Sequence, residues 1–265
     1  MLPSLLPMHE SLPIIAAHET PRIVEAKGVT YEDALRRHMH GRIAQILDNL
    51  PDGSTEPLVI LDMDGTLYGL DGENGGFQNS TKERHLTNAF TAYIQQQEPN
   101  LNPDEARQVF AQSLHHPIGP SLFLAERYDI HREDTFDPIW SMLDAEVIVG
   151  NPPHVVPDVL FEIRHRSCGI MLLTAAPQVW QQKVFKQLGL SPYDFDDVMT
   201  TEEFPSKKAV FETMRDLSPA MKAISVGDSG SSDIEPARTV GFQAIHIRNG
   251  TTFANVPGIL DELNA

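Results

Sequence analysis

Apolar and polar residues alternate along the second half of the chain in blocks that predict helices and strands in turn. Each of four short apolar runs follows a stretch with the periodicity of an amphipathic helix. Such alternation is typical of a parallel sheet with helices on both faces. The helices are expected at 155–166, 178–188, 207–217 and 233–240, and the strands at 169–176, 196–200, 223–228 and 242–247.

A further strand is predicted well upstream, at 57–64, where the run PLVILDMD stays apolar until it reaches two acids. A continuous apolar run is typical of a strand buried on both faces. The residues between this strand and the next are predicted to be helical, with Asn102, Pro103 and Glu105 forming the start of one helix. They therefore form an insertion into the sheet, and its other helices are expected near 84–97, 119–128 and 133–146.

The N-terminal 55 residues precede the first strand. Residues 1–30 are rich in proline and show no regular pattern, whereas 31–49 predict a helix. The predicted apolar face of this helix contains Ala34, Ile43, Ile46 and Leu47. We expect the segment either to pack on the rest of the chain or to form the contact of a homodimer.

The charge balance narrows the range of partners. The chain has 37 acidic and 20 basic side chains, a formal charge of −17, which argues against binding to nucleic acid or to an anionic membrane. No apolar run reaches the roughly 18 residues of a membrane span, and the N-terminus lacks the basic region of a signal peptide. Cys168, the single cysteine, excludes an internal disulfide, so the cytoplasm is the expected compartment.

Acidic residues gather where the predicted strands end. Ligands of parallel sheets bind at these carboxyl ends, and here the ends bring Asp62, Asp64, Asp228 and Asp233 together. Each pair of carboxylates about 4 Å apart would repel by about 4 kcal/mol at an effective dielectric near 20. A cation is therefore required, and a set of carboxylate oxygens favours Mg²⁺, which also binds phosphate oxygens.

The spacing of the first two acids suggests a division of work between them. Residues two apart in a strand point the same way, so Asp62 and Asp64 can flank one substrate, one as nucleophile and one as general acid and base. Thr174 can donate its hydroxyl to a phosphoryl oxygen, and a lysine can neutralise the developing charge.

These residues resemble the motifs of the haloacid dehalogenase superfamily. DMDGT at Asp62 to Thr66 is similar to its first motif, LLTAA at Thr174 to its second, and GDSGSSD at 227–233 to its fourth. The third motif is a lone lysine, for which this chain offers Lys207 and Lys208; we favour Lys207. Within the superfamily, DMDGTLY and the stretch from 228 to 247 look most like the pyrimidine 5′-nucleotidase-type hydrolases.

The resemblance implies a mechanism. Asp62 would attack the phosphoryl group and become an aspartyl-phosphate, while Asp64 would protonate the leaving alcohol and then activate the hydrolytic water. Mg²⁺ would be held by Asp62, the carbonyl of Asp64 and Asp228, with Asp233 either as a further ligand or as a support for the others.

The resemblance also implies a division of the chain. It predicts a Rossmann-like α/β core at 56–70 and 155–265, a mobile helical cap at 71–154, and an N-terminal extension at 1–55 outside the family pattern.

The expected function is hydrolysis of a small phosphorylated metabolite with Mg²⁺. A sugar phosphomutase uses the same residues and stays open as an alternative, as does a phosphate-binding protein without catalysis. A dehalogenase lacks an acid at the position of Asp64, and a phosphonate hydrolase needs a cap lysine, for which Lys82 is the one candidate in 71–154.

Overall fold

The computed structural model describes residues 30–51, 54–150, 155–248 and 252–264. The predicted irregular segment 1–30 therefore lies almost wholly outside the described residues. Within them, no helix is long and apolar enough to cross a membrane.

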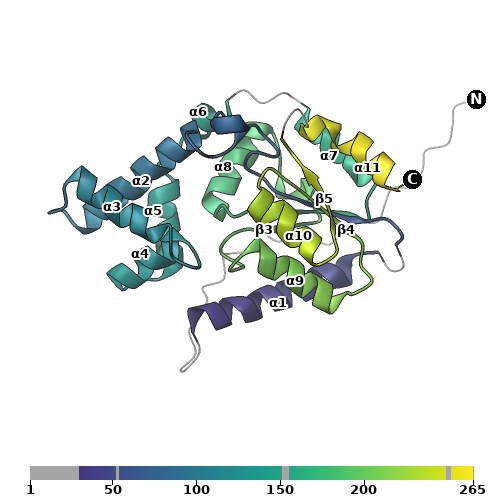
Figure 1. Ribbon diagram of the computed structural model, residues 1–265, viewed down its shortest axis with the longest axis horizontal. Coiled ribbons are helices and arrows are strands. Elements are labelled where there is room, and N and C mark those ends of the chain that lie inside the picture. Colours follow the sequence, from purple (N-terminus) through teal and green to yellow (C-terminus); the bar gives the residue numbers. More distant parts are fainter. Residues whose placement is uncertain (1–29, 52–53, 151–154, 249–251, 265) are drawn as a thin grey trace, which may run out of the picture.

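A parallel sheet of five strands forms the centre of the fold (Figure 1). The spatial order is β3-β2-β1-β4-β5, so the two strands that are far apart in sequence, β1 and β2, are neighbours, with Leu61 beside Leu172. This confirms the predicted α/β fold with a parallel sheet. The strands are β1 (Leu58–Leu61), β2 (Gly169–Leu173), β3 (Asp197–Met199), β4 (Ala223–Gly227) and β5 (Gln243–His246).

Helices cover both faces of this sheet, as predicted. On one face Val59 and Leu61 of β1 pack with α7 (Val156–Arg164), α8 (Gln178–Leu188) and α11 (Val256–Asn264). On the other, Leu58 and Ile60 pack with α1 (Tyr31–Asn49), α9 (Lys207–Leu217) and α10 (Glu235–Thr239). Because successive strand residues point to opposite faces, every residue of β1 is buried, which explains its continuous apolar run. We call the sheet with these helices the core.

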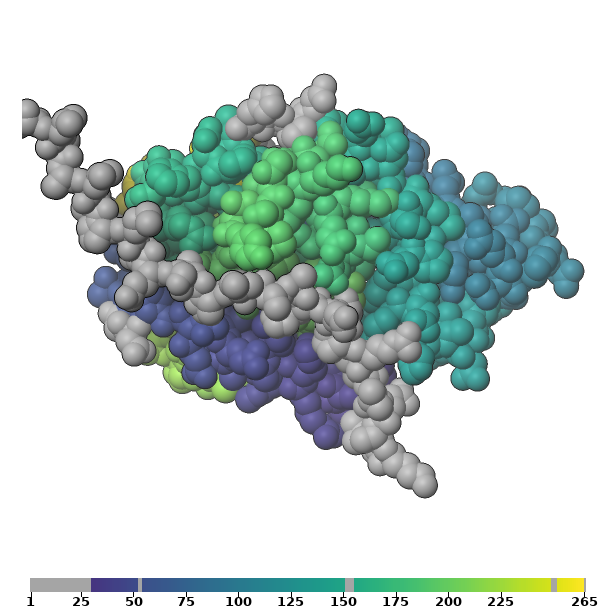
Figure 2. All heavy atoms as spheres, turned by 180° about the vertical axis from the view of Figure 1, so that it is seen from behind, coloured from purple at the N-terminus to yellow at the C-terminus, as the bar shows by residue number. Residues whose placement is uncertain are grey.

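A helical insertion separates β1 from β2 and extends from one end of the core (Figures 1 and 2). Phe90 and Phe110 stack in its interior with their ring centroids 4.7 Å apart, and its buried residues are continuous with those of the sheet face that α7 and α8 cover. Its helices are α2 (Thr81–Gln97), α3 (Pro103–Ser113), α4 (Pro120–Tyr128), α5 (Phe136–Trp140) and α6 (Ala145–Val149).

One predicted helix of the insertion is wrong. The stretch 133–146 does not form a single helix but divides into a 3₁₀ turn (Arg132–Thr135), α5 and α6. Asp144 causes the last break, because its carboxylate accepts the backbone N–H groups of Glu146 and Val147 and so starts a new helix. Lys183 of α8 donates to the carbonyls of Trp140, Ser141 and Leu143 at this break.

The N-terminal helix α1 spans the predicted residues and packs on α9 (Figure 1). Its buried face contains Leu35, Met39, Ile43 and Ile46, so two predicted face residues, Ala34 and Leu47, are only half-buried. Tyr31 at its start donates a hydrogen bond to Glu133 of the insertion over 2.9 Å. Packing on the rest of the chain is thus observed for α1, while a homodimer role stays a prediction.

Candidate active site

Three of the predicted residues directly follow neighbouring strands at the same edge of the sheet. Asp62 follows β1, Thr174 follows β2 and Asp228 follows β4. The predicted strand 57–64 is too long: pairing with both neighbours ends at Leu61, and the chain turns so that Thr66 and Leu67 donate to the carbonyl of Met63. Asp62 and Asp64 therefore lie just beyond the strand, although the backbone N–H of Asp62 still donates to the carbonyl of Val226 in β4 over 2.9 Å.

Three carboxylates meet at this edge. Asp62, Asp228 and Asp233 each bring one oxygen within 4.8 Å of the others. Two glycines make the approach possible, because a Cβ on Gly65 would lie 2.3 Å from Asp228 Oδ2 and one on Gly227 would lie 2.4 Å from Asp233 Cγ. The side chain of Asp64 lies outside this trio, and its predicted metal contact through the backbone carbonyl stays a prediction.

Lys207, and not Lys208, lies among these acids. Its Nζ donates to Asp62 Oδ1 over 2.5 Å and to Asp233 Oδ1 over 2.6 Å. Ser206 caps α9 so that Lys207 is the first helical residue and is buried, whereas Lys208 points outward with 61% of its side chain exposed.

The carboxylates and the ammonium of this cluster shift the pKa values of one another. Burial and the nearby carboxylates of Asp233 and Asp64 raise the pKa of Asp62 to about 7, against the opposing effect of Lys207. Burial and Asp233 raise the pKa of Asp228 to about 6. Burial alone would lower the pKa of Lys207, yet Asp62 and Asp233 raise it above its usual value. One ammonium thus faces three carboxylates, which leaves the site short of positive charge.

Two threonines complete the surroundings of Asp62. Thr66 donates its hydroxyl to Asp62 Oδ2 over 3.2 Å. Thr174 is fully buried and accepts the backbone N–H of Ala176 over 3.1 Å, which leaves its hydroxyl hydrogen available to a ligand.

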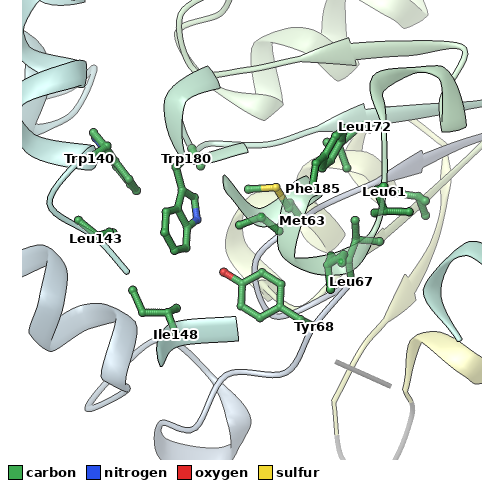
Figure 3. Packing of buried hydrophobic residues seen from close by; sticks show 14 of the residues in the cluster. Leu61, Met63, Leu67, Tyr68, Trp140, Leu143, Ile148, Leu172, Trp180 and Phe185 are labelled. Atoms are coloured by element: carbon green, nitrogen blue, oxygen red, sulfur yellow. The ribbon is translucent and has the colours of Figure 1, made fainter. Parts of the chain in front are cut away.

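Asp64 has a separate set of partners that sequence reasoning missed. Its Oδ1 accepts hydrogen bonds from Tyr68 Oη and from Trp180 Nε1, the latter over 2.9 Å, and lies 2.5 Å from Lys82 Nζ. Figure 3 shows Tyr68 and Trp180 close together, with Trp140 of the insertion opposite them. Burial would raise the pKa of Asp64, but Lys82 and the two hydrogen bonds lower it below the usual value. One signal for this contact was present in the sequence, since Lys82 is the one lysine of residues 71–154.

A family model matches most of the chain. Residues 57–241 match the haloacid dehalogenase-like hydrolases, so the chain belongs to this family of hydrolases. No curated protein sequence matches the chain.

Several solved structures are similar to the chain at low sequence identity, and the first of them shows the same fold. A HAD phosphatase from Thermococcus onnurineus is 21% identical, with a TM-score of 0.51 over 77% of this chain and 97% of its own. A haloacid dehalogenase-like family hydrolase from Xanthomonas campestris is 18% identical, with a TM-score of 0.48 over 81% and 94%. The L-2-haloacid dehalogenase from Xanthobacter autotrophicus is 13% identical, with a TM-score of 0.39 over 80% and 85%.

Proposed function

We propose that the protein is a Mg²⁺-dependent phosphomonoester hydrolase that acts through an aspartyl-phosphate. The observation that carries the proposal is the placement of two carboxyl groups with different partners at one sheet edge. Asp62 lies beside Lys207 in the acidic cluster, and Asp64 is held by Lys82, Tyr68 and Trp180. Two carboxyl groups in unlike environments are suited to unlike roles.

In the first step a carboxylate oxygen of Asp62 attacks phosphorus. The bond from Asp62 to phosphorus forms as the bond from phosphorus to the ester oxygen breaks. Asp64 is ionised in the free site because its pKa is lowered, so it takes up a proton from the monoanion of the bound ester and passes this proton to the departing alcohol. The hydroxyl of Thr174 and the ammonium of Lys207 stabilise the negative charge that develops on the phosphoryl oxygens. The hydrogen bonds that the described residues make to Asp64 end on Oδ1, so we assign Oδ2 to the ester oxygen.

In the second step water attacks the same phosphorus atom. Asp64, now ionised, takes a proton from this water, the bond from Asp62 to phosphorus breaks, and inorganic phosphate leaves. The hydrogen bonds from Tyr68 and Trp180 suit this step, because they stabilise the ionised form of Asp64.

The acidic trio fits a magnesium ion. Asp62, Asp228 and Asp233 supply an all-oxygen donor set, and their excess of negative charge over Lys207 is what a divalent cation would offset. When bound, Mg²⁺ would neutralise charge on the phosphoryl group and help to orient it.

Mg²⁺ is expected to raise the midpoint of thermal unfolding more at pH 8 than at pH 5. An acid whose pKa is raised by folding, as that of Asp62 is from 3.8 to about 7, destabilises the metal-free protein as the pH rises through that range. Mg²⁺ binds the ionised acids and reverses this cost. Thermal unfolding with Mg²⁺ and with a chelator at both pH values measures the effect. An equal response at both would contradict the assignment of these acids as ligands.

The proposed activity is tested by release of inorganic phosphate from a panel of monoesters with Mg²⁺. Nucleoside 5′-monophosphates belong in the panel because of the likeness of DMDGTLY to the pyrimidine nucleotidase-type hydrolases. We expect at least one ester to be hydrolysed and the activity to disappear with a chelator. Isomerisation of a sugar phosphate without net phosphate release would instead indicate a mutase, and binding without turnover would indicate the non-catalytic alternative.

A further inference from the structure

Lys82 belongs to the helical insertion, yet its side chain ends beside the proposed proton donor of the core. It lies in the first turn of α2, only 4% of it is exposed, and its Nζ is 2.5 Å from Asp64 Oδ1. Two indoles flank it, since Nζ lies 5.8 Å from the ring centroid of Trp140 and 5.5 Å from that of Trp180. The desolvation of a buried ion pair often costs more than its attraction returns, so the position of this ammonium indicates a role beyond packing.

Hydrogen-bond donors outnumber acceptors around Lys82. An ammonium has three N–H groups, and among the described residues Asp64 Oδ1 is its one acceptor. The indole N–H of Trp140, a residue that is 8% exposed, also has no partner in the part of the chain that the structure describes. Buried donors are normally satisfied, so this surplus points to a ligand that brings acceptor oxygens.

The surplus lies next to the expected position of the leaving group. Asp64 Oδ1 accepts hydrogen bonds from Tyr68 and Trp180 and pairs with Lys82. The other carboxylate oxygen, Oδ2, remains for the ester oxygen. The two oxygens of a carboxylate are about 2.2 Å apart, so Lys82 Nζ lies at most about 4.7 Å from Oδ2. Lys82 can therefore reach a substituent on the carbon that carries the ester oxygen.

We propose that Lys82 determines specificity by binding a carboxylate attached to the carbon that carries the ester oxygen. The substrates would then be phosphate esters of 2-hydroxy acids. The inference rests on the proposed function, because Asp64 marks the leaving group only in that reaction. A carboxylate fits better than a second phosphate, since a single ammonium balances a single charge. A cationic leaving group would be repelled by the same ammonium.

Three esters that differ only at one end of a two-carbon alcohol test the proposal on the unaltered protein. They are 2-phosphoglycolate, 2-hydroxyethyl phosphate and phosphoethanolamine, which present a carboxylate, a hydroxyl and an ammonium. With Mg²⁺ we expect kcat/KM to fall in that order, by at least about tenfold between the first and the last, as for loss of a hydrogen bond between charged groups. A flat or inverted order, or a preference for a nucleoside 5′-monophosphate over 2-phosphoglycolate, overturns the proposal.

Variants assign the preference to Lys82. Lys82→Met is expected to reduce the ratio between the carboxylate and ammonium esters to about threefold or less, and Lys82→Arg to retain most of it. Lys208→Met, the same substitution at an exposed lysine, is the matched control and should keep the wild-type ratio. Equal losses for all three esters in Lys82→Met would show a merely structural role and overturn the proposal.

Failure of this inference is distinguishable from failure of the proposed function. p-Nitrophenyl phosphate needs no proton to release its alcohol, so its Mg²⁺-dependent hydrolysis by the wild type reports on Asp62 chemistry without Lys82. Hydrolysis of this ester with no preference among the other three refutes the specificity role alone. If Lys82→Met does not fold, the wild-type order and Lys82→Arg still decide the matter.

Discussion

Asp62→Asn is expected to lower phosphate release by at least about a thousandfold while the protein stays folded. The amide cannot attack phosphorus, so the covalent step is lost, and removal of a nucleophile usually costs this much or more. The fold should tolerate the change, because Asp62 is a buried acid whose ionised form is disfavoured, with a pKa of about 7. The amide oxygen can still accept the hydrogen bond from Lys207.

Steady-state release of phosphate from the best ester of the panel measures this loss, and thermal unfolding checks the fold. Rapid acid quenching of the wild type during turnover should reveal a phosphoryl group on Asp62 by mass spectrometry, and the variant should show none. Asp216→Asn makes the same change at an exposed aspartate and should leave turnover unaltered. Activity of Asp62→Asn within tenfold of the wild type would refute the nucleophile assignment.

The order of elements could be predicted because it follows from local periodicity. The bounds of α1, α8 and α9 coincide with the predicted helices 31–49, 178–188 and 207–217, since each combines an apolar face with a clear end. The break at Asp144 was missed because capping by a side chain competes with the apolar periodicity of the same stretch.

The acidic cluster could be predicted because sheet topology brings strand ends together. Asp62, Asp228 and Asp233 need only a parallel sheet and the ends of β1 and β4 to become neighbours. The choice between Lys207 and Lys208 needed the structure, because it depends on which residue begins α9 after the Ser206 cap.

The surroundings of Asp64 could not be predicted in the same way. Trp180 lies 116 positions along the chain from Asp64, and Lys82 reaches it from a different part of the fold. Their meeting depends on how the insertion packs against α8, through contacts such as that of Trp140 with Trp180. Periodicity contains no information on such packing, so the residues that surround the leaving group emerged only from the three-dimensional arrangement.

Lys207→Met is expected to lower both turnover and stability. In the described part of the chain Lys207 is the cation that bonds to Asp62 and Asp233, and both acids are buried with it. Removing one partner of a buried ion pair typically costs about 3–5 kcal/mol, because the remaining charges stay buried without compensation. We therefore expect a loss of this size in the free energy of unfolding without metal at pH 8, measured with denaturant.

Mg²⁺ should stabilise the Lys207→Met variant more than the wild type, because the ion would then be the sole counter-charge to the acidic trio. Lys208→Met is the matched control. Lys208 is exposed and forms a surface ion pair with Glu212 at 3.7 Å, and such pairs contribute little. Its loss should therefore change the free energy of unfolding by no more than about 0.5 kcal/mol. Equal stability of the two variants would mean that the acids are already neutral in the metal-free protein. The negative charge on Asp62 and Asp233 would then depend on the metal rather than on Lys207.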